Sequence, residues 1–136
     1  MEEKRLVHVL LLEDNAHVAE LITEGFTGVA KRELGGRIGF AFEVCTNGQV
    51  ALERLRTSRA DLIISDVYMP VMDGPAFLRH VRTVFEGLGH HIPVIALSAG
   101  GAVAREAALA AGADVFLDKP IRLAVLLREV RRLLRL

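Results

Sequence analysis

The chain alternates short apolar, β-rich runs with stretches whose apolar residues recur at helical spacing, and this alternation limits the possible folds more than any other feature. Each apolar run has the length of one strand and is followed by one helix-like stretch. Strict alternation of this kind favours a parallel sheet with helices on both faces. The predicted strands are Leu6–Leu12, Phe40–Cys45, Leu62–Asp66, Pro93–Leu97 and Val115–Leu117.

Five amphipathic stretches follow these strands. Glycines end two of them: Gly35-Gly36 closes the first helix and Gly112 the fourth. The inward stripe of the third helix is predicted at Phe77 or Leu78, then Val81, Val84 and Phe85. The predicted helices are Ala16–Leu34, a short one containing Val50, Ala51, Leu52 and Leu55, one beginning at Asp73-Gly74-Pro75, then Ala102–Ala111 and Ile121–Leu134.

Length and charge exclude several classes of protein. The 136 residues predict one domain over positions 1–136, and 17 basic against 17 acidic side chains give zero net charge. That balance argues against nucleic-acid binding driven by bulk electrostatics, which needs surplus cations. One cysteine forms no internal disulfide, and no apolar run approaches the roughly 20 residues of a membrane helix. Without a signal-peptide core at its start, the chain is predicted to be a cytoplasmic globular protein with no membrane partner.

Polar side chains follow the strands at their carboxyl ends. The first strand is followed by Glu13 and Asp14, the third ends at Asp66, the fourth is followed by Ser98 and the fifth leads to Lys119. In open parallel sheets, ligand sites form at this edge, near the point where the strand order reverses. We therefore expect these residues to converge in space.

Their chemistry indicates phosphoryl transfer. Three carboxylates in one crevice need a cation, and oxygen-only ligands favour Mg²⁺. A hydroxyl and an ammonium bind phosphoryl oxygens, and a carboxylate can act as the nucleophile that forms an acyl phosphate, here Asp66. Each residue alone has a simpler interpretation: Asp14 or Asn15 as a helix cap, Asp66 as a turn residue, Ser98 as a cap, and Lys119 as a solvated lysine.

The sequence around Asp66 is more specific. The stretch 66–74, Asp-Val-Tyr-Met-Pro-Val-Met-Asp-Gly, occurs together with Leu-Leu-Glu-Asp-Asn at 11–15, Ala-Leu-Ser-Ala at 96–99 and Asp-Lys-Pro at 118–120. With these motifs the chain resembles, over nearly its whole length, a response-regulator receiver domain of the chemotaxis-regulator type. The resemblance implies an α/β, doubly wound, flavodoxin-like fold with five helices and strand order 2-1-3-4-5, the order that this family shares with flavodoxin.

The resemblance also implies site roles. Asp66 would accept a phosphoryl group from a histidine kinase or a phosphotransfer protein. Asp14 and Asp66 would ligate Mg²⁺ directly, with the backbone carbonyl of Tyr68 as a third ligand and Glu13 acting through water. Ser98 would bind a phosphoryl oxygen, beside Lys119.

The same family implies a switch rather than an enzyme, although the domain assists its own phosphorylation and dephosphorylation. Phe116 would change rotamer as Ser98 moves, and the signal would leave through helix 4, strand 5 and helix 5. The Lys119–Pro120 bond would be cis. The downstream partner would be a separate effector protein.

Some positions depart from the family pattern. Phe116 has no hydroxyl, Tyr68 is bulky at a position that controls water access, and Gly100-Gly101 frees the loop into helix 4. The first helix is long, and Gly35–Gly39 is predicted to extend its connection.

Other features have structural interpretations. Met69 and Met72 are predicted to pack in a loop, Cys45 in the core, and His90-His91 to be solvated. One side of the last helix is predicted to be a solvated face, with part of a partner surface as the alternative; it carries Arg128, Arg131, Arg132 and Arg135.

Alternatives to a stand-alone receiver remain open. The chain could be excised from a larger regulator. A hydrolase of the haloacid-dehalogenase type would need a second acid two residues after Asp66, where Tyr68 stands. A pseudo-receiver would lack members of the acidic and lysine set, and flavin binding is unsupported by a chain with no Trp and one Tyr.

Overall fold

The computed structural model describes residues 4–86 and 91–136 and contains a five-stranded parallel sheet in the order β2-β1-β3-β4-β5. This confirms the predicted fold class and strand order. The strands are β1 Arg5–Leu12, β2 Ile38–Cys45, β3 Leu62–Asp66, β4 Val94–Ser98 and β5 Val115–Asp118.

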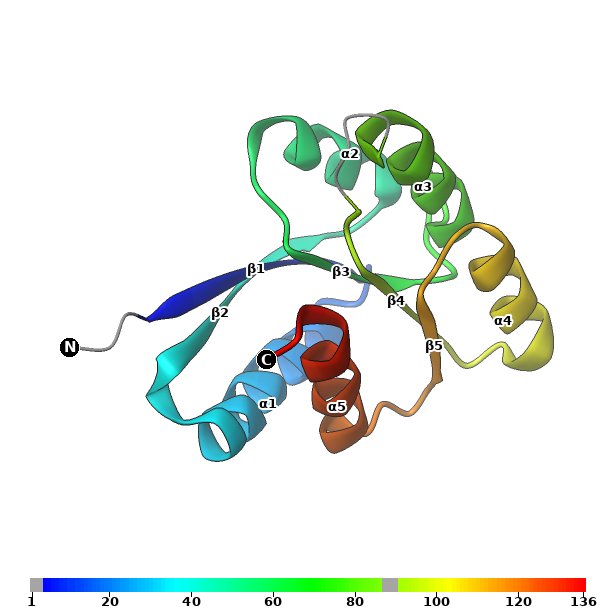
Figure 1. Cartoon of the computed structure of the whole chain (residues 1–136). Coiled ribbons are helices and arrows are strands. Elements are labelled where there is room, and N and C mark those ends of the chain that lie inside the picture. Colours follow the sequence, from blue (N-terminus) through cyan, green and yellow to red (C-terminus); the bar gives the residue numbers. More distant parts are fainter. Residues whose placement is uncertain (1–3, 87–90) are drawn as a thin grey trace.

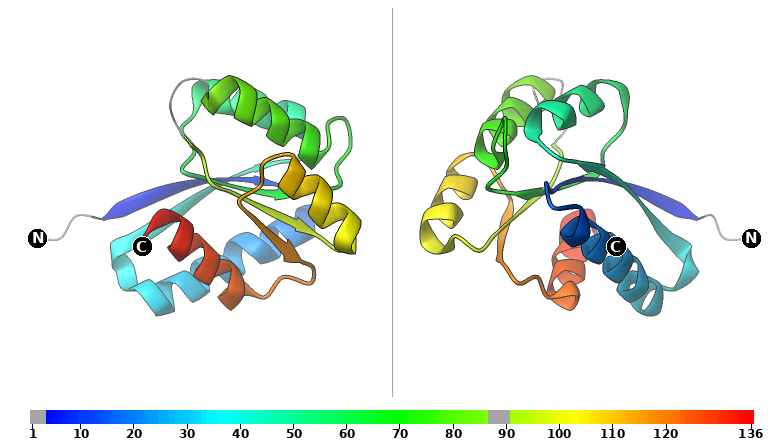
Figure 2. Two further views of the ribbon diagram at one scale, coloured as in Figure 1. Left: turned by 45° about the vertical axis from the view of Figure 1, so that its right-hand side comes forward. Right: turned by 180° about the vertical axis from the view of Figure 1, so that it is seen from behind.

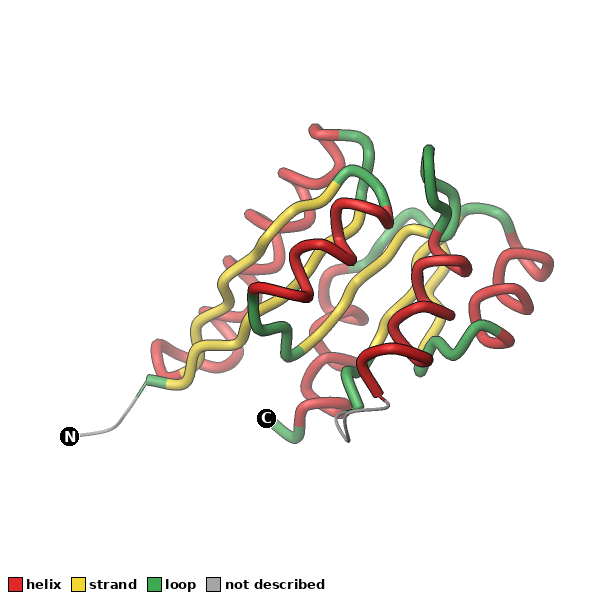
Figure 3. Tube along the Cα trace, turned by 90° about the horizontal axis from the view of Figure 1, so that it is seen from above, coloured by secondary structure: helices red, strands yellow, loops and turns green. Residues whose placement is uncertain are grey.

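Helices cover both faces of the sheet. Figure 1 shows α1 and α5 on one face and α2 and α3 on the other, with α4 beside β5, and the turned views of Figure 2 agree. Seen from above in Figure 3, the strands lie between helices in front of them and helices behind them. A 3₁₀ turn, η1 (Gly35–Arg37), follows α1, and a π-helical segment, η2 (Val81–Phe85), continues α3. The helices are α1 Ala16–Leu34, α2 Gly48–Thr57, α3 Gly74–His80, α4 Gly101–Ala110 and α5 Leu123–Leu134.

Two apolar clusters lie on the two faces of the sheet. Along β1, Leu10 and Leu12 pack with the α2–α3 side, whereas Val9 and Leu11 pack with α1 and α5. Because helices cover both faces, both sets of alternating side chains are buried, which explains why the strands are nearly continuous apolar runs.

Side-chain caps set the starts of three helices. Asn15 accepts from the Val18 N–H at the start of α1, Asn47 does the same for α2, and Asp73 accepts from the Ala76 N–H at α3. Because Asn15 is the cap, the neighbouring Asp14 is not needed for that role.

Some predicted boundaries were wrong. Strand β2 begins at Ile38 rather than Phe40, because all eight residues of β1 pair with β2 while only Val9–Leu12 pair with β3. The expected Gly35–Gly39 extension is therefore only the turn η1, and Gly39 lies in the sheet.

Several ends of predicted elements also shift. Helix α4 starts at Gly101 rather than Ala102 and ends at Ala110, and α5 starts at Leu123 rather than Ile121. Strand β4 runs from Val94 to Ser98, and β5 extends to Asp118.

Val84 does not face inward. Its side chain is 53% exposed, whereas Phe77, Leu78 and Val81 are buried and Phe85 packs at the edge of the core. The cause is η2, where the wider π-helical turn replaces the 3.6-residue repeat on which the prediction depended.

The expected packing of the sulfur-containing residues is confirmed. Met69 and Met72 pack against the cluster under α2 and α3, and the Cys45 side chain is buried in it. Burial, with a smaller contribution from the nearby Glu43 charge, raises the pKa of the Cys45 thiol to about 11. No helix within residues 4–86 and 91–136 is both long and apolar enough to cross a membrane.

Candidate functional site

The carboxyl ends of β1, β3 and β5 bring Glu13, Asp66 and Lys119 into direct contact. The Lys119 Nζ lies 2.9 Å from Glu13 Oε1 and 2.8 Å from Asp66 Oδ2. Leu12 is paired with Ser65, so the next residues along the two chains, Glu13 and Asp66, lie side by side. The long side chain of Lys119 reaches them from β5, across β4.

The electrostatics of this contact depend on the lysine. Glu13 is 3% exposed and Asp66 8% exposed, so two nearly buried carboxylates lie in one crevice. Burial acts to lower the Lys119 pKa, but its hydrogen bonds to Asp66 and Glu13 outweigh burial and raise that pKa above its ordinary value. Lys119 is therefore charged near neutral pH and balances part of the carboxylate charge.

Asp14 completes a cluster of three carboxylates. One oxygen from each of Glu13, Asp14 and Asp66 lies within 4.8 Å of the others, and Asp14 is exposed. Such an oxygen-only donor set suits Mg²⁺, which keeps several waters and takes few protein ligands. The donor set therefore fits the predicted metal.

The three carboxylates differ in how much they are already engaged. Glu13 Oε1 accepts from Lys119, and its Oε2 accepts from the Asn15 N–H at 3.2 Å. Asp66 Oδ1 accepts from the Tyr68 N–H at 3.3 Å. Asp66 is engaged to the same extent, because its Oδ2 accepts from Lys119 at 2.8 Å, so the hydrogen bonds do not separate Glu13 from Asp66 as a direct metal ligand.

Ser98 lies at the end of β4, between β3 and β5. It is 1% exposed, its Oγ accepts from the Gly100 N–H at 2.9 Å, and its carbonyl accepts from the Lys119 N–H at 2.9 Å. The hydroxyl therefore stabilises the loop into α4, but it is not the helix cap considered as its simpler role, because Gly100 is the N-cap of α4 and that helix has no side-chain cap hydrogen bond. The backbone bond to Lys119 places Ser98 next to the carboxylate–lysine cluster.

The Gly100-Gly101 pair has a packing role that the sequence did not reveal. A Cβ on Gly100 would lie 2.7 Å from Tyr68 Cε2 and 2.9 Å from the Ala104 Cβ. The half-exposed Tyr68 ring thus lies against the start of α4, and Gly101 adopts a positive φ of 66°. Gly100 therefore has two roles: it makes the loop easier to move, and its lack of a side chain leaves room for the Tyr68 ring.

Gly74 is a second glycine that matters to the site. A Cβ there would lie 2.4 Å from the Asp66 carbonyl oxygen, and the Gly74 N–H donates to the Val67 carbonyl at 3.0 Å. This close approach folds the 66–74 loop back on the end of β3.

Phe116, the second residue of the expected switch pair, is buried. Phe116 is 7% exposed and packs in the cluster under α2 and α3, so its ring lies inward in this structure. A rotamer switch would therefore require a second, outward position of the ring. The Lys119–Pro120 peptide bond is cis, as expected.

Two expectations outside the site have different outcomes. On α5, Arg128 and Arg132 both lie beside Glu129 and keep largely exposed side chains, consistent with a solvated face. His91 is not merely solvated, because its ring contacts Glu86 and Asp114. Asp114 lies 23 residues away in the sequence, and Glu86 stands before residues 87–90, so no local pattern indicated either contact. His90 lies outside the described residues.

Comparison with known proteins gives a consistent result. Residues 9–131 match the model of the response regulator receiver domain. The two-component response regulator ORR41 of Oryza sativa subsp. japonica is 36% identical over 134 residues, covering 94% of this chain and 97% of that protein. The response regulator MprA of Mycobacterium tuberculosis is 35% identical over 130 residues, covering 95% of this chain and 51% of that protein.

A solved structure gives the same result. The receiver domain of the Pseudomonas aeruginosa sensor histidine kinase PA1611, which has a magnesium ion coordinated in its active-site cleft, is 30% identical with a TM-score of 0.76. The alignment covers 96% of this chain and 98% of that one. The chain thus spans about half the length of MprA but nearly all of ORR41 and of the PA1611 receiver domain.

Proposed function

This chain belongs to the response-regulator receiver family and is a receiver domain of two-component signalling, and from that premise we propose that Asp66 is its phosphoryl acceptor. The observation that carries the proposal is the position of Asp66: a nearly buried carboxylate at the end of β3, bonded to Lys119 and next to two further acids. A signalling switch of this family needs one such modifiable carboxylate.

The proposed step is a balanced phosphoryl transfer. An Asp66 carboxylate oxygen attacks the phosphorus of a phosphohistidine, a P–O bond forms, and the donor P–N bond breaks. The bonding electrons go to the imidazole nitrogen of the donor, which takes up a proton from solvent. The product is an acyl phosphate on Asp66 and a free histidine on the partner. The phosphodonor is a histidine kinase or a phosphotransfer protein.

The residues around Asp66 position and neutralise the transferred group. Asp14 and Asp66, with the Tyr68 carbonyl, would hold Mg²⁺, which when bound offsets negative charge on the phosphoryl oxygens. Glu13 would act through water. Lys119 supplies a fixed positive charge at Asp66 Oδ2, and Ser98 is one strand away, where its hydroxyl would donate to a phosphoryl oxygen after leaving Gly100.

The signal would leave through α4, β5 and α5. Movement of Ser98 frees the loop into α4, and a change in the Phe116 ring would alter the surface above β5. Such couplings are typically worth about 1–3 kcal/mol, enough to shift a population. A separate effector protein would read this surface in the cytoplasm, without direct binding of nucleic acid by this chain. The chain acts as a phosphoacceptor switch rather than as an enzyme with a released product.

The test is intact-mass analysis after incubation with a small phosphodonor and Mg²⁺. We expect one phosphoryl adduct in the wild type and none in Asp66→Asn. Asp118→Asn is the matched control, because it removes an exposed carboxylate from the same edge of the sheet and should keep the adduct. An adduct that persists in Asp66→Asn would refute the proposal.

The switch has its own test. Structures with and without a beryllofluoride phosphoryl mimic should differ in the Ser98 hydroxyl contact and in the Phe116 ring. If both side chains keep the same positions, the signal uses another route.

A further inference from the structure

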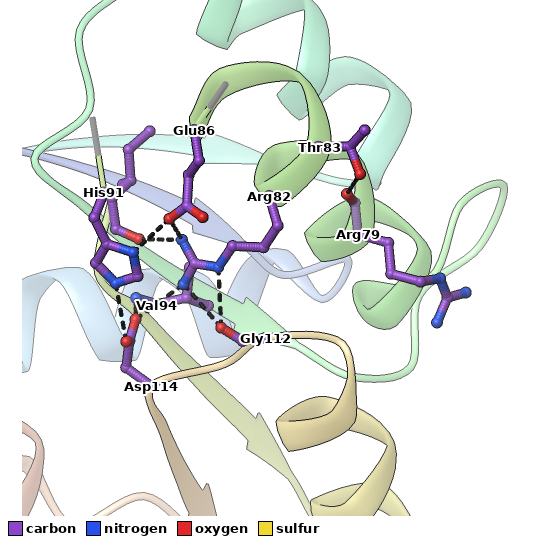
Figure 4. Close-up of polar contacts among 9 residues, drawn as sticks. Arg79, Arg82, Thr83, Glu86, His91, Val94, Gly112 and Asp114 are labelled. Carbon is purple, nitrogen blue, oxygen red and sulfur yellow. Dashed lines mark hydrogen bonds and ion pairs between the residues drawn. The ribbon is translucent and has the colours of Figure 1, made fainter. Parts of the chain in front are cut away.

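A second polar cluster lies at the other end of the sheet from Asp66. It is formed by Arg82 and Glu86 from the end of the α3–η2 helix, His91 before β4, and Asp114 before β5 (Figure 4). These residues come from three segments that lead into the amino ends of β4 and β5. The site described above, at the carboxyl ends, uses none of them.

Arg82 is the centre of this cluster. Its side chain is 15% exposed, its Nε and Nη2 donate to the Gly112 carbonyl at 3.0 and 2.8 Å, and its Nη1 donates to the Ile92 carbonyl at 2.8 Å. The same guanidinium pairs with Glu86 and with Asp114 (Figure 4). One side chain thereby joins the helix end, the segment before β4 and the α4–β5 connection.

His91 closes the cluster on the solvent side. Its Nδ1 contacts Glu86 Oε1, and its Nε2 lies 3.0 Å from Asp114 Oδ1 (Figure 4). A neutral imidazole has one donor and one acceptor nitrogen, so only the charged ring donates at both contacts. Within the four side chains of the cluster, Arg82 balances one of the two carboxylates, and a charged His91 would balance the other.

We propose that His91 is a proton-controlled clasp that holds the α4–β5 connection against the end of the α3–η2 helix. With the ring charged, it bridges Glu86 and Asp114. When the ring loses its proton, one nitrogen presents a lone pair to a carboxylate oxygen, and that contact opens. The clasp acts on α4 and β5 independently of phosphoryl chemistry.

Asp114 links the clasp to the sheet. Its Oδ2 accepts from the Val94 N–H at 2.8 Å, and its own N–H donates to the Val94 carbonyl at 2.9 Å. Val94 is the first residue of β4. Opening of the His91 contact removes a partner of Asp114 Oδ1, while Arg82 still holds Oδ2, so we expect the Val94 amide to lose part of its protection and thereby to report the state of the clasp.

Other charged groups around His91 do not provide this switch. Besides Arg82, Glu86 and Asp114, His91 faces a hollow of about 500 Å³ whose charged lining residues are Arg5, Arg59, Asp61 and Arg135. Arginines keep their charge in this range, and Asp61 already accepts from the Arg59 side chain. Among these types of side chain, histidine is the one that ordinarily changes charge between pH 5 and 8.

The first experiment compares thermal unfolding of the full chain at pH 5.5 and pH 8.0. The charged ring stabilises the closed clasp, so the added stability is present at the lower pH and is lost as the pH rises. We expect the midpoint of the wild type to fall by about 2–5 °C more than that of His91→Gln. His17→Gln, which removes an exposed histidine from α1, should keep the wild-type pH dependence. Equal pH dependence in His91→Gln and the wild type would overturn the proposal.

The second experiment uses only the wild-type protein. Nuclear magnetic resonance of the His91 ring should show protons on both nitrogens at pH 5.5. Over the same titration, exchange of the Val94 amide, corrected for its intrinsic pH dependence, should accelerate as the ring loses its proton. A ring that titrates without any change in Val94 protection would overturn the clasp.

Discussion

Replacement of Lys119 by methionine tests how the buried acids are held. The change keeps most of the apolar stem and removes the ammonium that bonds Glu13 at 2.9 Å and Asp66 at 2.8 Å. Glu13 and Asp66 are then left nearly buried, 3% and 8% exposed, without their common counter-charge. Removal of one partner from such a cluster leaves the remaining charges uncompensated, and this is the main source of the instability.

The magnitude follows from the contacts. Hydrogen bonds to charged groups contribute about 1.5–3 kcal/mol each, so two such bonds give about 3–6 kcal/mol. The Lys119 side chain is 23% exposed, and water screens part of this interaction. We therefore expect the free energy of unfolding to fall by about 2–4 kcal/mol. At about 3–4 °C per kcal/mol for a domain of this size, the midpoint of thermal unfolding should drop by roughly 6–16 °C.

The assay is urea unfolding at pH 7, with Lys31→Met as the matched control. Lys31 is exposed near the end of α1, so its replacement should change stability by less than about 0.5 kcal/mol. Added Mg²⁺ should restore more stability to Lys119→Met than to the wild type, because it supplies positive charge to the same acids. A loss below about 1 kcal/mol, or equal to that of Lys31→Met, would refute the electrostatic reasoning.

Four further outcomes are expected. Asp14→Ala should abolish Mg²⁺ binding in a calorimetric titration. Because Asp14 is exposed, the circular dichroism and the unfolding midpoint of this variant should stay near those of the wild type. An unchanged Mg²⁺ affinity would place the metal elsewhere. Gly74→Ala should lower the free energy of unfolding in urea by about 3 kcal/mol, because its Cβ would lie 2.4 Å from a backbone oxygen. Gly28→Ala, whose Cβ has ordinary spacing in the middle of α1, should instead raise it by about 0.5–1 kcal/mol. Folding raises the Lys119 pKa, so the contribution of Lys119 to the free energy of unfolding should be complete below the ordinary lysine pKa of 10.5. That contribution should be lost as the pH rises through the higher pKa of the folded state. Unfolding curves from pH 9 to 11.5 should therefore show this alkaline loss in the wild type and not in Lys119→Met.

The layout of the site was predictable because parallel strands share a direction. Once strands were expected before Glu13, at Asp66 and before Lys119, their carboxyl ends had to meet at one edge, and the structure brings these side chains within hydrogen-bond distance. The sequence also predicted the cap of the first helix as one of two residues, and Asn15 is the one that caps it. The cap is predicted from residues close together in the sequence, whereas the meeting of the distant site residues follows from the shared direction of the strands.

The features that were missed depend on contacts between distant segments or on local geometry that spacing does not encode. The solvent exposure of Val84 follows from a local change to π-helical geometry that the apolar spacing does not reveal. The role of His91 depends on Asp114, which lies 23 residues away and reaches it only after β4 and β5 pair. The need for glycine at position 100 depends on where the Tyr68 ring lies, which no periodicity predicts.

The sharing of one apolar cluster by α1 and α5 has a consequence for synthesis of the protein. Phe26 of α1 and Leu126 of α5 are fully buried in the same cluster, over the sheet face that carries Leu11 and Ile64. A chain growing on the ribosome makes the α2 and α3 covering of the opposite face well before α5 is available. Until α5 emerges, α1 alone shields that face, and an apolar surface rich in leucine and isoleucine stays open to chaperones or to other nascent chains. Closure of the native core therefore requires that α5 has emerged from the ribosome.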